Sequence, residues 1–149
     1  MKKNVQVKNR LGKVFYYAEY DEKNNWIYAS WKGFVTVDDV KAGAEKYLEF
    51  MKETGCPHLL NDNSELTGPW DGANEWIAND WTPRALAAGL KNFAHIVSPN
   101  VFGEISAKNM EVKLEKMGFT MKTFKQSSEA ANWLKKQIKG TDGLYLKSA

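Results

Sequence analysis

The most informative part of the sequence is His58-Leu59-Leu60-Asn61-Asp62-Asn63-Ser64-Glu65-Leu66-Thr67-Gly68. An apolar, strand-like segment at residues 58–61 ends in polar residues and then a glycine. In an open α/β sheet, the carboxyl ends of parallel strands face the crevice where ligands and partners bind. The stretch therefore predicts a short central strand followed by a functional polar loop, without the signature of a particular reaction.

The segments on either side predict alternating strands and helices. Residue periodicity and turn signals predict strands at 14–20, 26–31, 58–61, 92–97 and 119–124, and helices at 37–54, 83–90, 105–117 and 127–138. The first two strands form a hairpin, and the βα units after it imply parallel strands. We expect a single α/β domain over residues 1–149, with a mixed sheet of about five strands and helices packed on it. Its core spans about 13–139, with a basic segment at 1–12 and a loop-like tail at 140–149.

Composition and charge narrow the classes of function. The net charge of +3 is too small to indicate nucleic acid, and the region between Lys52 and Arg84 holds six acids and no base. A field of that sign repels phosphate backbones. Cys56 is the only cysteine, so no intrachain disulfide forms, and a reducing cytoplasm fits. The sequence has neither the apolar core of a signal peptide nor a membrane-span pattern, so we expect a cytoplasmic protein.

No arrangement of residues completes a catalytic or metal-binding motif. His58 and His95 are the only histidines, and with Cys56 they form no compact ligand set, so we expect no metal. Ser64 could be activated by His95 with Asp62 as orienter, but the Gly-x-Ser-x-Gly elbow of hydrolases is absent. Glycine-rich nucleotide loops are also absent, so we expect no cofactor and no catalytic residue.

Three tryptophans follow the polar loop. Trp70, Trp76 and Trp81 lie among glycines, prolines and acids. Tryptophan is a favoured anchor at binding surfaces, and large aromatic side chains also fill cores. The sequence leaves open whether these rings line a pocket or fill the core.

The layout resembles the STAS-like, or SpoIIAA-like, family of small bacterial α/β proteins over about residues 13–139. The resemblance rests on element order, on the break at Trp31-Lys32-Gly33 and on Leu59-Leu60-Asn61-Asp62-Asn63-Ser64 as central strand and polar loop. It implies a hairpin followed by βα units, with helices on one face of the sheet. In classical members the loop looks like Asp-Ser-Ser/Thr-Gly and carries a serine or threonine that a partner kinase phosphorylates. Asp62 matches the acid, and Ser64 is the nearest candidate for the phosphorylated position.

These observations predict a non-catalytic regulatory or protein-interaction module. We expect it to dock a partner through Asp62, Asn63, Ser64, Trp70, Trp76 and Trp81. The alternative is a carrier or sensor of a small amphipathic ligand in a tryptophan-lined pocket, as the lipid-transfer-like branch of the resemblance implies. A small hydrolase is the less favoured third reading. Unpaired edge strands and the surplus of aromatic residues favour self-association as a homodimer.

Overall fold

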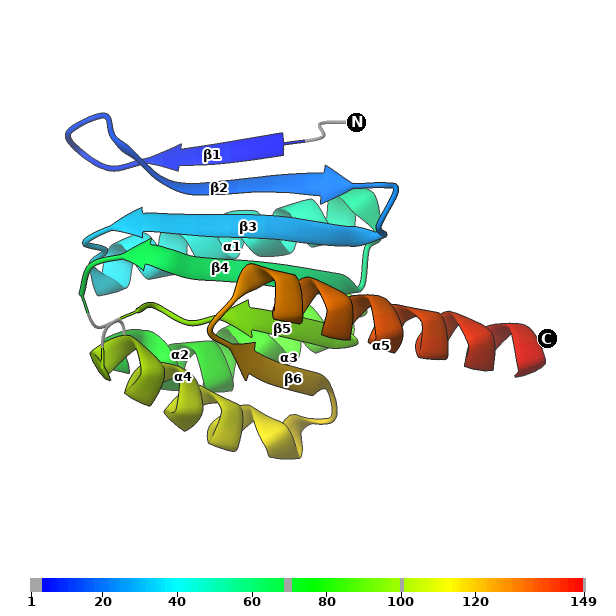
Figure 1. Ribbon diagram of the computed structural model, residues 1–149. Coiled ribbons are helices and arrows are strands. Elements are labelled where there is room, and N and C mark those ends of the chain that lie inside the picture. Colours follow the sequence, from blue (N-terminus) through cyan, green and yellow to red (C-terminus); the bar gives the residue numbers. More distant parts are fainter. Residues whose placement is uncertain (1–3, 69–70, 100, 149) are drawn as a thin grey trace.

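A six-stranded mixed sheet organises the chain. The computed structural model describes residues 4–68, 71–99 and 101–148, and Figure 1 shows their arrangement. The strands lie in chain order, antiparallel from β1 to β3 and parallel from β3 to β6. Their bounds are β1 Asn4–Lys8, β2 Val14–Asp21, β3 Trp26–Gly33, β4 His58–Leu66, β5 Asn92–Ile96 and β6 Thr120–Phe124. The predicted α/β fold with a mixed sheet is confirmed.

Helices connect the parallel strands, and one more helix follows the last strand. They are α1 Val37–Thr54, α2 Asn74–Trp76, α3 Thr82–Ala87, α4 Val101–Leu114 and α5 Ser127–Ser148. Shorter turns complete the connections: η1 Asp71–Ala73, the π-helical η2 Ile77–Trp81 and η3 Glu115–Met117. Residues 71–87 therefore form a nearly continuous helical run between β4 and β5, which begins well before the helix predicted at 83–90.

The first crossover helix follows its local signals. Thr36 accepts a hydrogen bond from the Asp39 backbone N–H, and the Asp39 carboxylate accepts one from the Thr36 N–H, which completes a capping box. The helix ends at Gly55, whose φ of 72° is the left-handed conformation that glycine adopts most easily. Val40, Ala44 and the later apolar positions then face the sheet, as the spacing predicts.

Both chain ends differ from the prediction. Residues 4–8, predicted as part of a basic segment outside the core, form β1 because Val5 and Val7 alternate with polar residues and pack against the apolar core. The predicted tail from residue 140 is also wrong, because α5 continues to Ser148. Gly140 weakens a helix intrinsically, but it does not end this one.

The polar run belongs to a strand. β4 extends to Leu66, where the sequence predicted a loop after Asn61. β3 extends to Gly33, two residues beyond the strand predicted at 26–31. Its Lys32 and Gly33 pair with Glu65 and Leu66 and so satisfy backbone groups of this polar segment. The predicted loop is therefore reduced to the connection that begins at Thr67.

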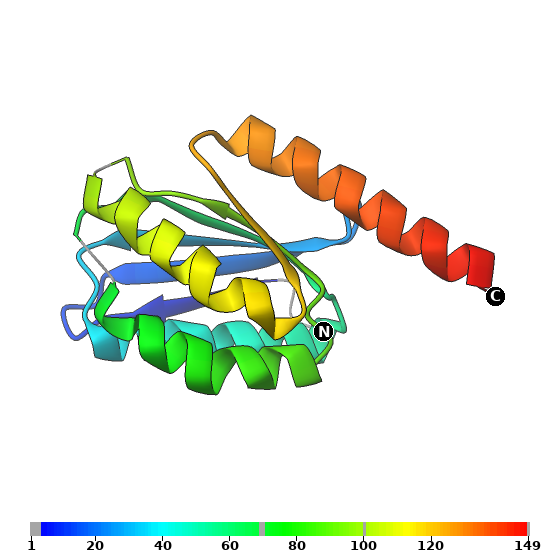
Figure 2. The same ribbon diagram turned by 90° about the horizontal axis from the view of Figure 1, so that it is seen from below.

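Helices cover both faces of the sheet. Figure 2 shows α5 on one side and α1 with α3 on the other. Ala130, Leu134 and Ile138 of α5 pack against the face that carries Leu60 and Ala94, and α1 packs on the opposite face. The family resemblance implied helices on one face only, and this expectation is wrong. Among the described residues, no helix combines the length and the apolar character that crossing a membrane requires.

Candidate functional site

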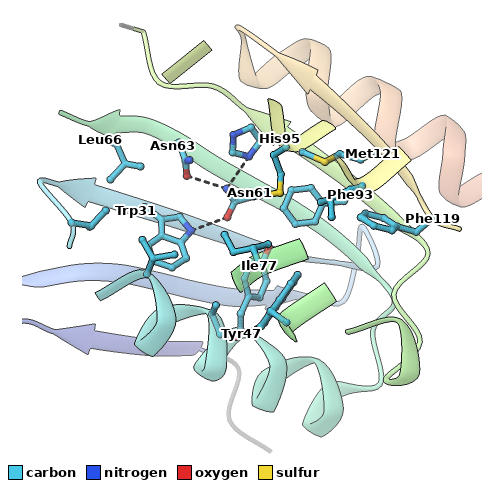
Figure 3. Close-up of a pocket in the computed structure, with 16 residues that line it drawn as sticks. Trp31, Tyr47, Asn61, Asn63, Leu66, Ile77, Phe93, His95, Phe119 and Met121 are labelled. Carbon is cyan, nitrogen blue, oxygen red and sulfur yellow. Dashed lines mark hydrogen bonds between the residues drawn. The ribbon is translucent and has the colours of Figure 1, made fainter. Parts of the chain in front are cut away.

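A small cavity lies between the sheet and the helices on its α1 face. Its volume is about 80 Å³, it is partly open, and its walls are mostly apolar. Figure 3 shows side chains from three neighbouring strands forming one wall. The sheet and the segments beside it contribute Trp31, Val35, Asn61, Asn63, Leu66, Phe93, His95, Phe119 and Met121. The helical elements contribute Val40, Ala44, Tyr47, Ile77, Trp81, Met110 and Leu114.

Strand alternation explains why polar and apolar groups meet in this cavity. Successive side chains of a strand point to opposite faces. Leu59 belongs to the core on the α1 face, and Asn61 and Asn63 follow it on that face. Asn61 pairs with His95 in the β4–β5 register, which brings the imidazole to the same wall. Asn63 and His95 are 4% and 2% exposed, so both polar groups are held away from bulk water.

Hydrogen bonds from Asn61 hold this polar wall together. The Trp31 indole Nε1–H donates to Asn61 Oδ1 at 2.8 Å. The Asn61 amide Nδ2 lies 3.0 Å from Asn63 Oδ1, to which it donates, and 3.1 Å from His95 Nδ1. The dashed lines in Figure 3 mark these three contacts. Four side chains from three strands are thereby joined in one network.

The indole assigns the donor and acceptor roles of the network. An indole N–H can only donate, so the atom facing Trp31 must be the Asn61 oxygen. The Asn61 amide nitrogen then faces Asn63 and His95 and donates to both. His95 Nδ1 is consequently an acceptor, and the imidazole carries its proton on Nε2.

His95 is neutral at physiological pH. Burial lowers the pKa of its imidazole from the ordinary 6.5 to about 4, and the Asp62 carboxylate opposes the shift only in part. A neutral ring agrees with the acceptor role that the network assigns to Nδ1. The histidine therefore contributes polarity but no positive charge to the cavity.

Tyr47 brings a polar group from the helical side. It extends from α1 toward the cavity (Figure 3) and is 3% exposed. Within the described part of the chain, its hydroxyl has no hydrogen-bond partner. Burial, with a smaller contribution from Cys56, raises the pKa of this phenol well above its usual value. A buried hydroxyl without a partner costs free energy, so its position at a cavity is informative.

The residues predicted as the docking loop are separated by the sheet. Asn63 lines the cavity, whereas Asp62 accepts hydrogen bonds from the Tyr28 hydroxyl at 2.8 Å and the Ser64 backbone N–H at 2.9 Å. Tyr28 packs with the core on the α5 face, and burial followed by this bond to Asp62 raises its pKa. The strand thus directs neighbouring polar residues to different surroundings.

Ser64 is exposed and takes no part in the cavity wall. The β3–β4 register shifts between Ser30 and Lys32, so Asn63 and Ser64 together lie opposite Trp31. His95 is buried in the cavity wall. Ser64 therefore lies outside the cavity wall to which His95 belongs.

The tryptophans have different positions. Trp81 is buried, lines the cavity and donates from its indole N–H to the Ala44 carbonyl at 2.7 Å, which ties η2 to α1. Trp76 is half-buried against the core, with the Lys41 ammonium 5.7 Å from its ring centroid. Trp70 lies outside the described residues. Trp31, which the sequence analysis did not select, is the tryptophan that organises the polar wall.

Metal binding has no support among the described residues. They contain no group of three or more histidine, cysteine or acidic side chains placed to hold an ion. The chain's other buried histidine, His58, instead contacts the Asn92 amide, with its Nδ1 3.1 Å from Asn92 Nδ2. The candidate site is therefore the apolar cavity with its uncharged polar wall.

Comparison with known proteins adds no relative. No protein-family model, curated protein or solved structure matches the chain. The STAS-like resemblance accordingly stays a prediction from the sequence, and the function has to be argued from the geometry of the cavity.

Proposed function

We propose that this protein is a non-catalytic carrier or sensor that binds a small, largely apolar ligand in the cavity between the sheet and α1, η2 and α4. One observation carries the proposal: an apolar cavity has a few convergent polar groups fixed on one wall. Ligand sites in proteins commonly combine apolar walls with a small number of placed polar groups that orient the ligand. The network of Trp31, Asn61 and His95 holds those groups in position before any ligand arrives.

The size of the cavity limits the ligand. Its volume of about 80 Å³ is roughly half that of the engineered ~150 Å³ cavity that binds benzene. A molecule of a few heavy atoms fits, as does one end of a longer molecule whose remainder lies at the open side. Met110 and Met121 form part of the wall near α4. Methionine side chains adapt to irregular shapes, so this wall is the one that can yield to a larger ligand.

A cavity-filling substitution tests the proposal. We expect Val40→Phe to occupy the cavity and to remove saturable binding of toluene, an uncharged apolar probe that can place one end in the cavity and the rest at its open side. Binding can be followed by NMR of ¹³C-labelled methionine methyl groups, where Met110 and Met121 should shift and Met51, a core residue outside the cavity, should not. The control is Val112→Phe, the same change at a position that is 65% exposed on α4.

The two variants separate cavity binding from surface adsorption. Wild type and Val112→Phe should give the same saturable methyl shifts, and Val40→Phe should give none while it keeps a folded spectrum. Non-saturable shifts in the wild type, or equal binding by folded Val40→Phe, would refute the proposed function.

A regulatory interaction through the exposed polar segment is the second candidate. Its supporting observation is the exposure of Ser64 and Glu65, which lie next to the Asp62–Tyr28 pair. Ser64→Arg should abolish affinity capture of a specific protein from a cell extract, whereas Ser128→Arg at another exposed serine should not. Capture that is absent in the wild type, or unaffected by Ser64→Arg, would remove this candidate.

A further inference from the structure

We infer that the ligand of this cavity presents an uncharged hydrogen-bond acceptor, such as the carbonyl oxygen of a ketone, ester or amide, to the donors of Tyr47 and Asn63. The inference rests on the proposed function and adds the chemical class of the ligand. Two observations support it. Some polar atoms of the cavity take no part in hydrogen bonds among the described residues, and no described residue of the cavity lining is charged.

The Asn63 amide supplies the first donor. Because Trp31 fixes the orientation of Asn61, the Asn61 nitrogen must face the Asn63 oxygen. The Asn63 Nδ2 group is therefore the end of that amide that the network does not use. Among the described residues it donates no hydrogen bond, although Asn63 is buried and lines the cavity.

The Tyr47 hydroxyl supplies the second donor. It lies on the helical side of the same cavity, buried and without a hydrogen-bond partner in the described part of the chain. Buried polar groups in native proteins nearly always have a partner, and an exception calls for an explanation. An acceptor atom of a bound ligand would satisfy this hydroxyl.

Charge selects against ionised ligands. Of the described residues that line the cavity, none is lysine, arginine, aspartate or glutamate, and His95 is neutral at physiological pH. A ligand carboxylate could accept hydrogen bonds from these donors, but it would be buried without a counter-ion. The Asp62 carboxylate, on the opposite face of β4, would also repel it. An ammonium group would face the Asn63 amide donor and could donate only to the single hydroxyl oxygen of Tyr47, with no carboxylate among the described lining residues to balance its charge. A neutral carbonyl avoids both penalties and can accept a hydrogen bond from a donor of this cavity.

Matched six-carbon probes test this ligand class. At pH 7, 2-hexanone should bind roughly ten-fold or more tightly than hexanoate and hexylammonium, measured by the Met110 and Met121 methyl shifts. Tyr47→Phe should weaken 2-hexanone binding by roughly three- to ten-fold, the range expected for one hydrogen bond, and leave toluene binding unchanged.

Tyr16→Phe is the matched control. Tyr16 is also fully buried and its hydroxyl also lacks a partner among the described residues, but it does not line the cavity. Both variants remove one buried oxygen, so neither should lower the melting temperature, and only Tyr47→Phe should change the affinity for 2-hexanone.

The outcomes distinguish this inference from the function on which it rests. Suppose that toluene binds. If hexanoate or hexylammonium then binds as tightly as 2-hexanone or more tightly, the inferred ligand class is wrong and the cavity proposal stands. The same holds if Tyr47→Phe leaves the affinity for 2-hexanone unchanged. If neither toluene nor 2-hexanone binds, the proposed function itself fails.

Discussion

The single polar group of Trp31 determines how the hydrogen bonds of the cavity wall are oriented. Its indole N–H can only donate, and this restriction determines the orientation of the Asn61 amide. That orientation in turn determines which atoms of Asn63 and His95 face inward to the network. One side chain that can only donate thus determines the direction of every hydrogen bond in this network.

The burial of His95 predicts a specific dependence of stability on pH. Its pKa falls from 6.5 to about 4 in the folded chain, so between these values the unfolded chain binds a proton that the folded chain does not. The free energy of unfolding should therefore decrease as pH falls from 7 to 4, by up to about 3 kcal/mol from this residue. Comparing urea unfolding of wild type and His95→Gln at pH 7.5 and pH 4.5 isolates this contribution.

Glutamine is chosen because it keeps a hydrogen-bond acceptor near Asn61 and does not titrate. The wild type should lose more stability than the variant over this pH interval. An equal loss in both proteins would show that His95 is not held neutral by the fold.

At the scale of elements, the contact between α1 and β3 controls the position of the Trp31 ring. Gly43 lies on α1 directly against this indole, and a Cβ added there would come 2.4 Å from its Cη2 atom. A real side chain never approaches another so closely, so the glycine is required by packing and not by backbone conformation. The helix therefore carries a residue that weakens it intrinsically in order to make room for the tryptophan.

Two glycine substitutions in helices should have opposite effects on stability. Gly43→Ala gains helix propensity but displaces Trp31, and we expect a net loss of about 1–3 kcal/mol in the free energy of unfolding. Gly140→Ala in α5, where nothing lies within 4 Å of the added Cβ, should instead gain up to about 1 kcal/mol.

Urea unfolding measures both changes, and toluene binding reports whether the cavity wall has moved. A Gly43→Ala protein as stable as the wild type and with unchanged binding would mean that the indole can be displaced at no cost.

Over the whole molecule, the sheet separates two kinds of packing. On one face, Leu134 and Ile138 of α5 close against Leu60 and Ile96 with apolar contacts. On the other face, α1, η2 and α4 leave a space above the polar wall. The α4 side of that space is lined by methionine and leucine, which makes it the adaptable boundary. The fold therefore places its candidate ligand site on the face where the packing is incomplete.

Local sequence signals predict the α/β class, the order of most strands and helices, and the start of α1, because periodicity, capping residues and glycine terminators act between residues close in the chain. Two of the residues predicted for the site, Asn63 and Trp81, line the cavity, and the ligand pocket that the sequence offered as an alternative stays a prediction. Local signals did not predict β1, the full length of β4 or the continuation of α5, because these depend on pairing and packing with distant segments.

Which polar residues share a cavity wall depends on contacts between distant segments. Asn61 meets Trp31 and His95, which lie about 30 residues away in either direction along the chain. It does so through strand register, and a shift of one residue would turn the strand's side chains to the other face. Such register is set by long-range pairing of whole strands. Local sequence patterns therefore predict the polar run but not the separation of Asp62 from Asn63 by the sheet.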